Sequence, residues 1–115
     1  MRTVPERDWK KLRSLHPELL AETCERIFVQ VRELIDDVDK GSHARYLALF
    51  GLMRKSDREI AELFDGLKRS NAIYMLAAMR RHGLLTDELL ERFSEETRTS
   101  VETLLSAKQR WASST

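Results

Sequence analysis

The residues of this chain most able to do chemistry are its three histidines, His16, His43 and His82. Imidazole binds metal ions and serves as a general base near neutral pH. None of the three has a partner at the His-Glu-x-x-His spacing, which places two metal ligands on one helix face. Each lies instead beside an end of an expected helix, where a histidine interacts favourably with the helix dipole. The sequence therefore predicts capping or solvent exposure for these side chains, and no metal site.

The densest carboxylate cluster consists of Asp36, Asp37 and Asp39. It lacks the Asp-x-Asp-x-Asp-Gly pattern and the distal glutamate of a calcium loop, and Gly41 lies at the wrong position for one. A solvated helix end is the favoured interpretation. Because acidic residues at a helix C-terminus oppose the helix dipole, we expect Lys40 or basic residues of the following helix to offset them.

Cys24 is the only cysteine, which excludes an intrachain disulfide and a cysteine-paired zinc site. A reducing cytoplasm is therefore the expected compartment. Leu20, Ile27 and Phe28 lie near Cys24 at helical spacing, so we expect a buried structural thiol rather than a reactive one.

The usual sequence signs of nucleotide cradles and hydrolase elbows are absent: Gly-x-Gly-x-x-Gly, Gly-x-x-x-x-Gly-Lys-Ser/Thr and Gly-x-Ser-x-Gly. The sequence predicts no catalytic residue and no cofactor, and we expect a protein that is not an enzyme. An active site that only the fold assembles from distant residues stays open as a weaker alternative.

A stretch between residues 56 and 85 resembles the helix-turn-helix core of winged-helix regulators. It runs Ser-Asp-Arg-Glu-Ile-Ala from Ser56, Arg-Ser-Asn from Arg69, and Arg-Arg-His-Gly-Leu-Leu from Arg80. In such regulators a capped Ile-Ala helix precedes a recognition helix started by a serine, and a Gly-Leu exit follows. The resemblance implies binding of duplex DNA, with these candidate contacts: Lys68, Arg69, Asn71, Arg80 and Arg81.

Two features favour a buried hairpin over a DNA-reading element. A recognition helix needs a polar face for base edges, but residues 72–79 offer only Tyr74 among apolar neighbours. A further helix is expected after Thr86, where the wing strands would follow. Because the formal net charge is also only +1, nucleic acid is the alternative partner rather than the favoured one.

Helical periodicity and capping signals extend through the first 67 residues. A short helix is expected from Pro5 to Pro17, and a second from Pro17 to about Asp39, since proline is welcome at the first helical position. Ser42 is placed to cap a third helix. A Ser-x-x-Glu capping box at Ser56 predicts the start of a fourth helix.

The most apolar helix is expected from Asn71 to His82, and residues 72–79 should form the buried centre of the fold. Gly83 is a natural left-handed stop. The elements together predict an all-α fold, a compact single-domain bundle of about six or seven helices over residues 1–115.

Two more caps, Thr86 and Ser94, predict a helix through Phe93 and a last one with Trp111 on its inner side. Residues 112–115 are expected to fray.

The amino-acid composition of the whole chain agrees with this organisation. Hydrophobic residues make up 42% and charged residues 34% of the 115, which is ordinary for a globular helical protein. The longest apolar run, near Met75–Met79, is far shorter than the roughly 20 residues of a membrane span, and the first residues lack the apolar stretch of a secretory signal. We therefore expect an intracellular protein without membrane contact.

Surplus hydrophobic surface carries the functional expectation. Residues 18–55 supply two wide apolar stripes, and a core of this size is not expected to cover Phe28, Tyr46 and Phe50 from every side. The favoured function is a binding or interaction module that forms a homo-oligomer or engages a protein partner. The alternative is a DNA-binding regulator that acts through residues 56–85.

Overall fold

The computed structural model describes residues 3–113, with the side chains of residues 3–107. Its helices are α1 (Glu6–Ile35), α2 (Ser42–Phe64), the 3-10 turn η1 (Arg69–Asn71), α3 (Ala72–Arg81), α4 (Asp87–Leu90) and α5 (Glu95–Ser113). No strand occurs in this described part of the chain, so the all-α class is confirmed. It holds five α-helices where six or seven were expected, because two expected boundaries lie inside helices.

Pro17 is the first of these boundaries, and α1 continues through it for a total of 30 residues. A proline inside a helix removes one backbone hydrogen bond and crowds the preceding turn, at a cost of about 3 kcal/mol. Pro17 and Arg13, whose carbonyl loses its partner, are both exposed, so the interruption faces solvent. Leu12, Leu15 and Leu19 on both sides of it pack into one core, and this burial keeps the helix continuous.

Ser56 is the second boundary, and here too the prediction was wrong. It lies buried within the 23 residues of α2, seven residues before the buried Leu63 and on the same face. The apolar spacing continues from the partly buried Leu52 through it to Ile60 and Leu63, so the helix has packing on both sides of the serine. A Ser-x-x-Glu pattern starts a helix only where that periodicity also begins.

Three other expected boundaries are confirmed. Gly83 ends α3 with φ of +73°, the left-handed conformation that glycine adopts without strain. Thr86 caps α4, since its hydroxyl oxygen accepts a hydrogen bond from the backbone N–H of Leu89 at 3.2 Å. Ser94 accepts one from the N–H of Thr97 at 3.4 Å at the start of α5.

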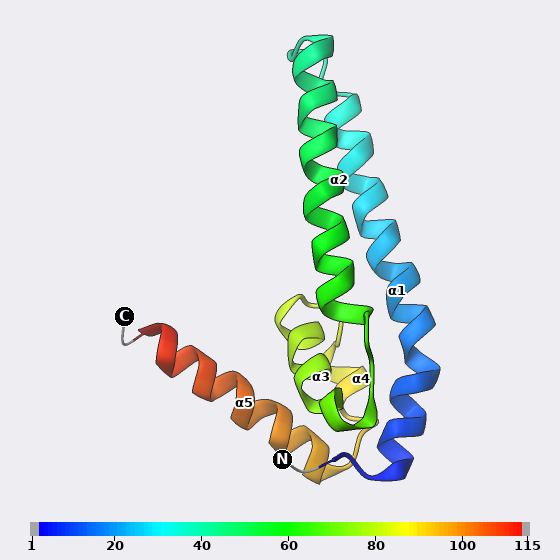
Figure 1. Ribbon diagram of the computed structural model, residues 1–115, viewed down its shortest axis with the longest axis vertical. Coiled ribbons are helices and arrows are strands. Elements are labelled where there is room, and N and C mark those ends of the chain that lie inside the picture. The colour runs from blue at the N-terminus through cyan, green and yellow to red at the C-terminus, as the bar shows by residue number, and fades with distance from the viewer. Residues whose placement is uncertain (1–2, 114–115) are drawn as a thin grey trace.

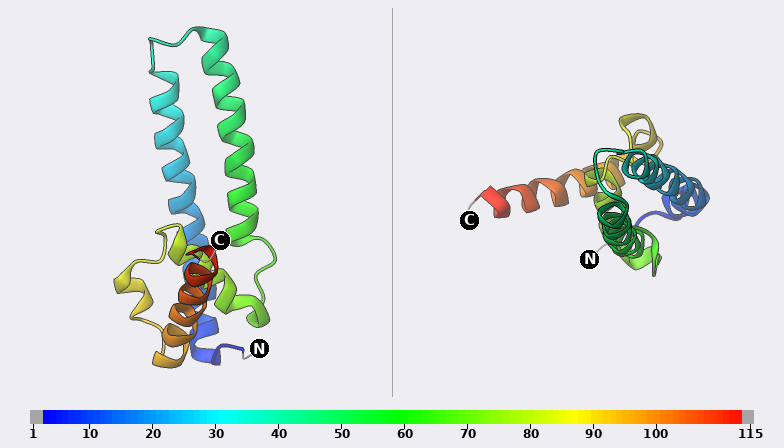
Figure 2. Two further views of the ribbon diagram at one scale, coloured as in Figure 1. Left: turned by 90° about the vertical axis from the view of Figure 1, so that its left-hand side faces the viewer. Right: turned by 90° about the horizontal axis from the view of Figure 1, so that it is seen from above.

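An arm and a base make up the molecule (Figures 1 and 2). The long helices α1 and α2 form an antiparallel hairpin, while η1, α3, α4 and the start of α5 gather around its lower end. The principal extents are 51 × 37 × 24 Å and the radius of gyration is 17.0 Å, compared with about 13 Å for a spherical domain of this length. The upper half of the hairpin, residues 28–53, therefore projects beyond the base; we call it the distal arm.

The core lies in the base and is centred on α3, as predicted. Seven of the ten α3 residues are buried, and Leu76, Ala77 and Met79 are fully inaccessible. They pack with α1, the end of α2 and α5. One face of α3 remains open at Tyr74, which is 49% exposed.

The C-terminal expectations lie largely outside the described residues. The α5 helix runs to Ser113, whereas the side chain of Trp111 and residues 114–115 are not described. Within the described part of the chain, no helix combines the length and the apolar character needed to cross a bilayer.

Candidate interaction surface

Large apolar side chains are left exposed almost entirely on the distal arm. Of the nine that the structure describes as exposed, only Tyr74 belongs to the base. The other eight are Phe28, Val29, Ile35, Val38, Tyr46, Leu47, Phe50 and Met53. Single exposed apolar residues are common on proteins, whereas a concentration of this kind on one projection is typical of interaction surfaces.

The exposure follows from the architecture of a two-helix arm. Two helices bury only the seam between them, and along the distal arm Val31, Leu34 and Leu49 reach only partial burial. In the base the same helices also meet α3 and α5, where Leu12 and Leu63 lose almost all their exposure. The apolar stripes of α1 and α2 thus continue past the point where the chain can cover them.

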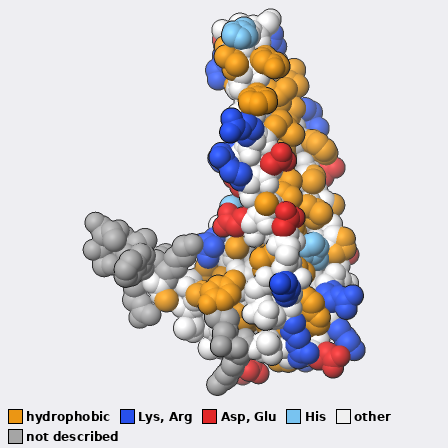
Figure 3. Space-filling model, viewed as in Figure 1, with side chains coloured by type: hydrophobic (Ala, Val, Ile, Leu, Met, Phe, Trp, Pro, Cys, Tyr) orange, Lys and Arg blue, Asp and Glu red, His pale blue; other side chains and the backbone are white. Residues whose placement is uncertain are grey.

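Two rows of these side chains share one side of the arm. Tyr46, Phe50 and Met53 follow each other at steps of four and three along α2, and Phe28 and Ile35 lie two turns apart on α1. Each row begins about 100° of helical rotation after the seam, and equal rotations on antiparallel helices turn toward the same side. Figure 3 shows hydrophobic side chains over both helices of the upper arm on one side. We call these five residues the arm face.

Neighbouring side chains hold the aromatic members of the arm face in place. The ring of His43 stacks on Tyr46 with centroids 6.4 Å apart and an interplanar angle of 14°. The guanidinium of Arg54 lies 5.7 Å from the centroid of the Phe50 ring, within range of a cation–π interaction. A surface whose large side chains are already ordered loses less conformational entropy when it is covered.

The tip of the arm is closed by a basic residue of the second helix. Arg45 donates a hydrogen bond from Nη1 to the carbonyl oxygen of Ile35, the last residue of α1, at 2.6 Å. A basic residue of the following helix therefore meets the negative end of the α1 dipole. Its compensation of the nearby carboxylates stays a prediction. The described residues contain no cluster of metal-ligating side chains here or elsewhere.

Two further contacts join α1 to the end of α2 and to the end of α3. His16 donates from Nε2 to the carbonyl oxygen of Phe64 at 3.0 Å, and its ring meets that of Phe64 edge to face at 5.3 Å. Arg26 donates to the carbonyl oxygens of His82 and Gly83 at 3.3 and 3.1 Å. The ends of α2 and α3 thus both receive positive or polar donors from α1, which complements the negative end of each helix dipole.

A buried carboxylate joins the first helix to the last. Asp8, 1% exposed, accepts hydrogen bonds from the backbone N–H of Ser94 at 3.0 Å and from the hydroxyls of Ser94 and Thr97. Burial raises the pKa of Asp8, but these hydrogen bonds and the nearby Arg7 lower it more, so its pKa lies below the ordinary value. Asp8 therefore serves as an ionised cap for α5, supplied by α1.

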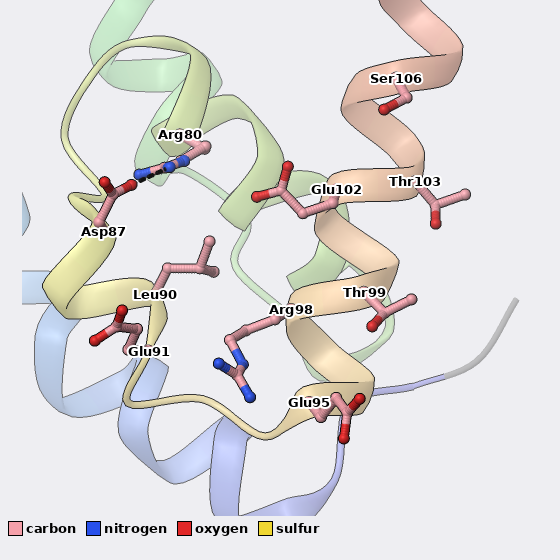
Figure 4. Close-up of a pocket in the computed structure, with 10 residues that line it drawn as sticks. All are labelled: Arg80, Asp87, Leu90, Glu91, Glu95, Arg98, Thr99, Glu102, Thr103 and Ser106. Carbon is pink, nitrogen blue, oxygen red and sulfur yellow. Dashed lines mark hydrogen bonds and ion pairs between the residues drawn. The ribbon is translucent and has the colours of Figure 1, made fainter.

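A groove of about 740 Å³ lies between α4 and α5, beside the end of α3 (Figure 4). Arg80 enters it but is ion-paired with Asp87, and it also donates to the carbonyl oxygen of Leu85 at 2.7 Å. Arg98 points away from that pair, and its buried Nε has no hydrogen-bond partner. Glu91 and Glu102 add negative charge to the lining. Mixed charges that do not converge on one point give the groove no defined ligand.

The residues suggested for DNA contact are divided between the two ends of α3. Lys68, Arg69 and Asn71 precede the helix, and Arg80 and Arg81 end it, about 15 Å away along the axis.

Three of the five already bond within the protein. Arg69 donates from Nε to the carbonyl oxygen of Val4 at 2.9 Å, Arg80 bonds within the groove, and Asn71 bonds to Lys68 and Gly66. The face between the two ends is the buried core, apart from Tyr74. After Thr86 the chain forms α4, a helix in place of wing strands.

Histidines and the cysteine take local structural positions. His43 lies in the first turn of α2 and His82 caps the C-terminus of α3, as expected for helix ends, while His16 lies inside α1 and caps another helix. Cys24 is only partly buried, whereas the sequence predicted a fully buried thiol in the core.

Comparison of the chain with protein-family models, with curated proteins and with solved structures finds no match.

Proposed function

We propose that this protein is a non-enzymatic interaction module that self-associates through the arm face, so that two hairpins pack into a four-helix assembly. The observation that carries the proposal is the row of half-exposed aromatic and aliphatic side chains on a projection that no other described element covers. We also propose that the protein is cytoplasmic, because a chain with a single cysteine cannot form an intrachain disulfide.

The available area suits a second copy of the same chain. Phe28, Tyr46 and Phe50 are 49%, 63% and 54% exposed, and a large side chain of this kind can bury about 150–250 Å². The five arm-face residues therefore offer about 500 Å² of apolar area. A polar rim brings such a surface near the roughly 800 Å² that each partner buries in a standard stable interface.

Sedimentation equilibrium at micromolar concentration tests the proposal. We expect a mass above the 13.5 kDa of one chain. Phe50→Asp should return the protein to a monomer, because an unpaired carboxylate in an apolar interface costs several kcal/mol, or a hundredfold or more in affinity.

Tyr74→Asp is the matched control, since Tyr74 is an aromatic residue of similar exposure in the base. It should leave the mass of the assembly unchanged. If the wild-type protein stays monomeric up to high concentration, the proposal is wrong. If the two substitutions have equal effects, the interface does not lie on the arm face.

A further inference from the structure

The two helices carry opposite charge along the distal arm and the turn just below it. Between residues 25 and 39 the sequence has five acidic and two basic side chains, and one of the basic ones, Arg26, is engaged with the end of α3. Between residues 40 and 55 it has four basic side chains and no acidic one. In these segments α1 is therefore net negative and α2 net positive. Beside the arm face, the outer edge of α1 carries Glu25, Arg32 and Asp36 and that of α2 carries Arg54, so the two edges have net charges of opposite sign.

Two arms can meet face to face in two symmetric ways. In a parallel pair, the two-fold axis runs along the arms, both bases lie at one end, and α1 of each copy meets α2 of the other. In an antiparallel pair, the bases lie at opposite ends, and α1 meets α1 while α2 meets α2. The first arrangement joins opposite charges along both edges, and the second joins like charges along both.

From this charge pattern we infer that the occupant of the arm face is the arm of a second copy in parallel orientation, with α1 of each chain against α2 of the other. The inference rests on the proposed self-association and adds its geometry.

A specific pair of exposed side chains marks the joined edges. Glu25 lies ten residues before the end of α1, and Arg54 lies twelve residues after the start of α2, so the two lie about 15 and 18 Å below the tip. Each borders the arm face: Glu25 is one turn before Phe28, and Arg54 covers the ring of Phe50. In the parallel pair Glu25 of one copy therefore comes to the level of Arg54 of the other.

Charge reversal tests this pairing. Glu25→Arg and Arg54→Glu should each weaken self-association about threefold to tenfold at low salt, and an equal mixture of the two variants should recover much of the lost affinity through mixed dimers. Glu18→Arg, an exposed reversal nearer the base, is the control and should have no effect. No recovery in the mixture would contradict the pairing.

Distances between spin labels decide the orientation. The background variant is Cys24→Ser, with its self-association first shown equal to that of the wild type. In this background, Gly41→Cys carries one spin label and, in a separate variant, Lys10→Cys carries another. A side chain at Gly41 meets no atom within 4 Å, and Lys10 is exposed on α1. Lys10 lies about 21 residues, or about 32 Å, below the middle of the arm face.

In a parallel pair the Lys10 labels should lie within about 40 Å of each other, separated only by the width of two hairpins. In an antiparallel pair centred on the arm face they would lie about 65 Å apart. The Gly41 labels lie near each other in either arrangement and so report association itself. A long distance between the Lys10 labels with a short distance between the Gly41 labels would contradict the parallel orientation but support self-association. If neither label pair gives a measurable distance, both the orientation and the self-association are wrong.

Discussion

The link between Asp8 and the start of α5 should make an unusually large contribution to the stability of the base. Replacing Asp8 with Ala removes a buried carboxylate and leaves three donors without it, the N–H and hydroxyl of Ser94 and the hydroxyl of Thr97. A hydrogen bond to a charged group contributes about 1.5–3 kcal/mol, and a buried donor without a partner costs about 1–3 kcal/mol. Because the two hydroxyls can partly satisfy each other, we expect a loss of about 3–5 kcal/mol rather than the full sum.

Asp8→Asn removes the negative charge but keeps a side chain of nearly the same size, so it measures the contribution of the charge alone. The amide oxygen can still accept from the N–H of Ser94, so the expected loss is about 1–3 kcal/mol. The folded pKa of Asp8 lies below its unfolded value of 3.8, so its stabilising contribution is complete above that pH and is lost as the pH falls through the folded pKa. The stability difference between the wild type and Asp8→Asn should therefore be constant from about pH 5 upward and shrink below about pH 4.

Urea unfolding followed by circular dichroism, from pH 7 down to pH 3, measures both quantities. Using the difference between the two proteins cancels the titration of the other carboxylates. A loss below about 1 kcal/mol for Asp8→Ala, or a difference that does not change on acidification, would show that the carboxylate does not act as an ionised cap.

Three other outcomes test the fold and the alternative function. Leu76→Ala should cost about 2–5 kcal/mol in urea unfolding, because it empties a fully buried position in α3; a loss below about 1 kcal/mol would contradict the central place of that helix. Pro17→Ala should stabilise the protein by about 1–3 kcal/mol and raise its melting temperature, because the carbonyl of Arg13 regains its helical partner; a loss of stability would show that α1 needs the proline. In fluorescence anisotropy with random-sequence duplexes, binding should be weaker than about 10 micromolar near physiological salt, and nanomolar affinity that falls when Arg80 and Arg81 become Ala would favour the DNA-binding alternative.

Local patterns in the sequence predicted the elements of the base well. The run of apolar residues in α3, the left-handed stop at Gly83 and the cap at Thr86 depend on the chain within a few residues of themselves, so local rules suffice. The errors at Pro17 and Ser56 have the opposite origin. Both residues carry a local signal for a boundary, and in both the packing of residues on either side decides the outcome.

The contacts that hold the elements together could not be predicted in the same way. Arg26 reaches the end of α3 across 56 residues of sequence, and Asp8 reaches the start of α5 across 86. Nothing in the neighbourhood of either residue identifies its partner, since a lone arginine or aspartate on a helix is ordinarily a solvated one. The expected exposure of Phe28, Tyr46 and Phe50 is confirmed, because it required only a comparison of the apolar stripes with the size of the core.

The choice of residues along the distal arm supports a covered surface rather than an accident of folding. Away from the arm face, α1 carries exposed polar residues such as Gln30 and Glu33, so the sequence does use solvated side chains where an arm surface faces water. On the arm face it places Phe28, Tyr46 and other large apolar side chains instead. A hairpin this long would be equally helical with Lys or Glu at those positions, since helix propensity does not require them. Their burial by a second arm would turn an unfavourable exposed surface into the additional packing that a two-helix projection otherwise lacks.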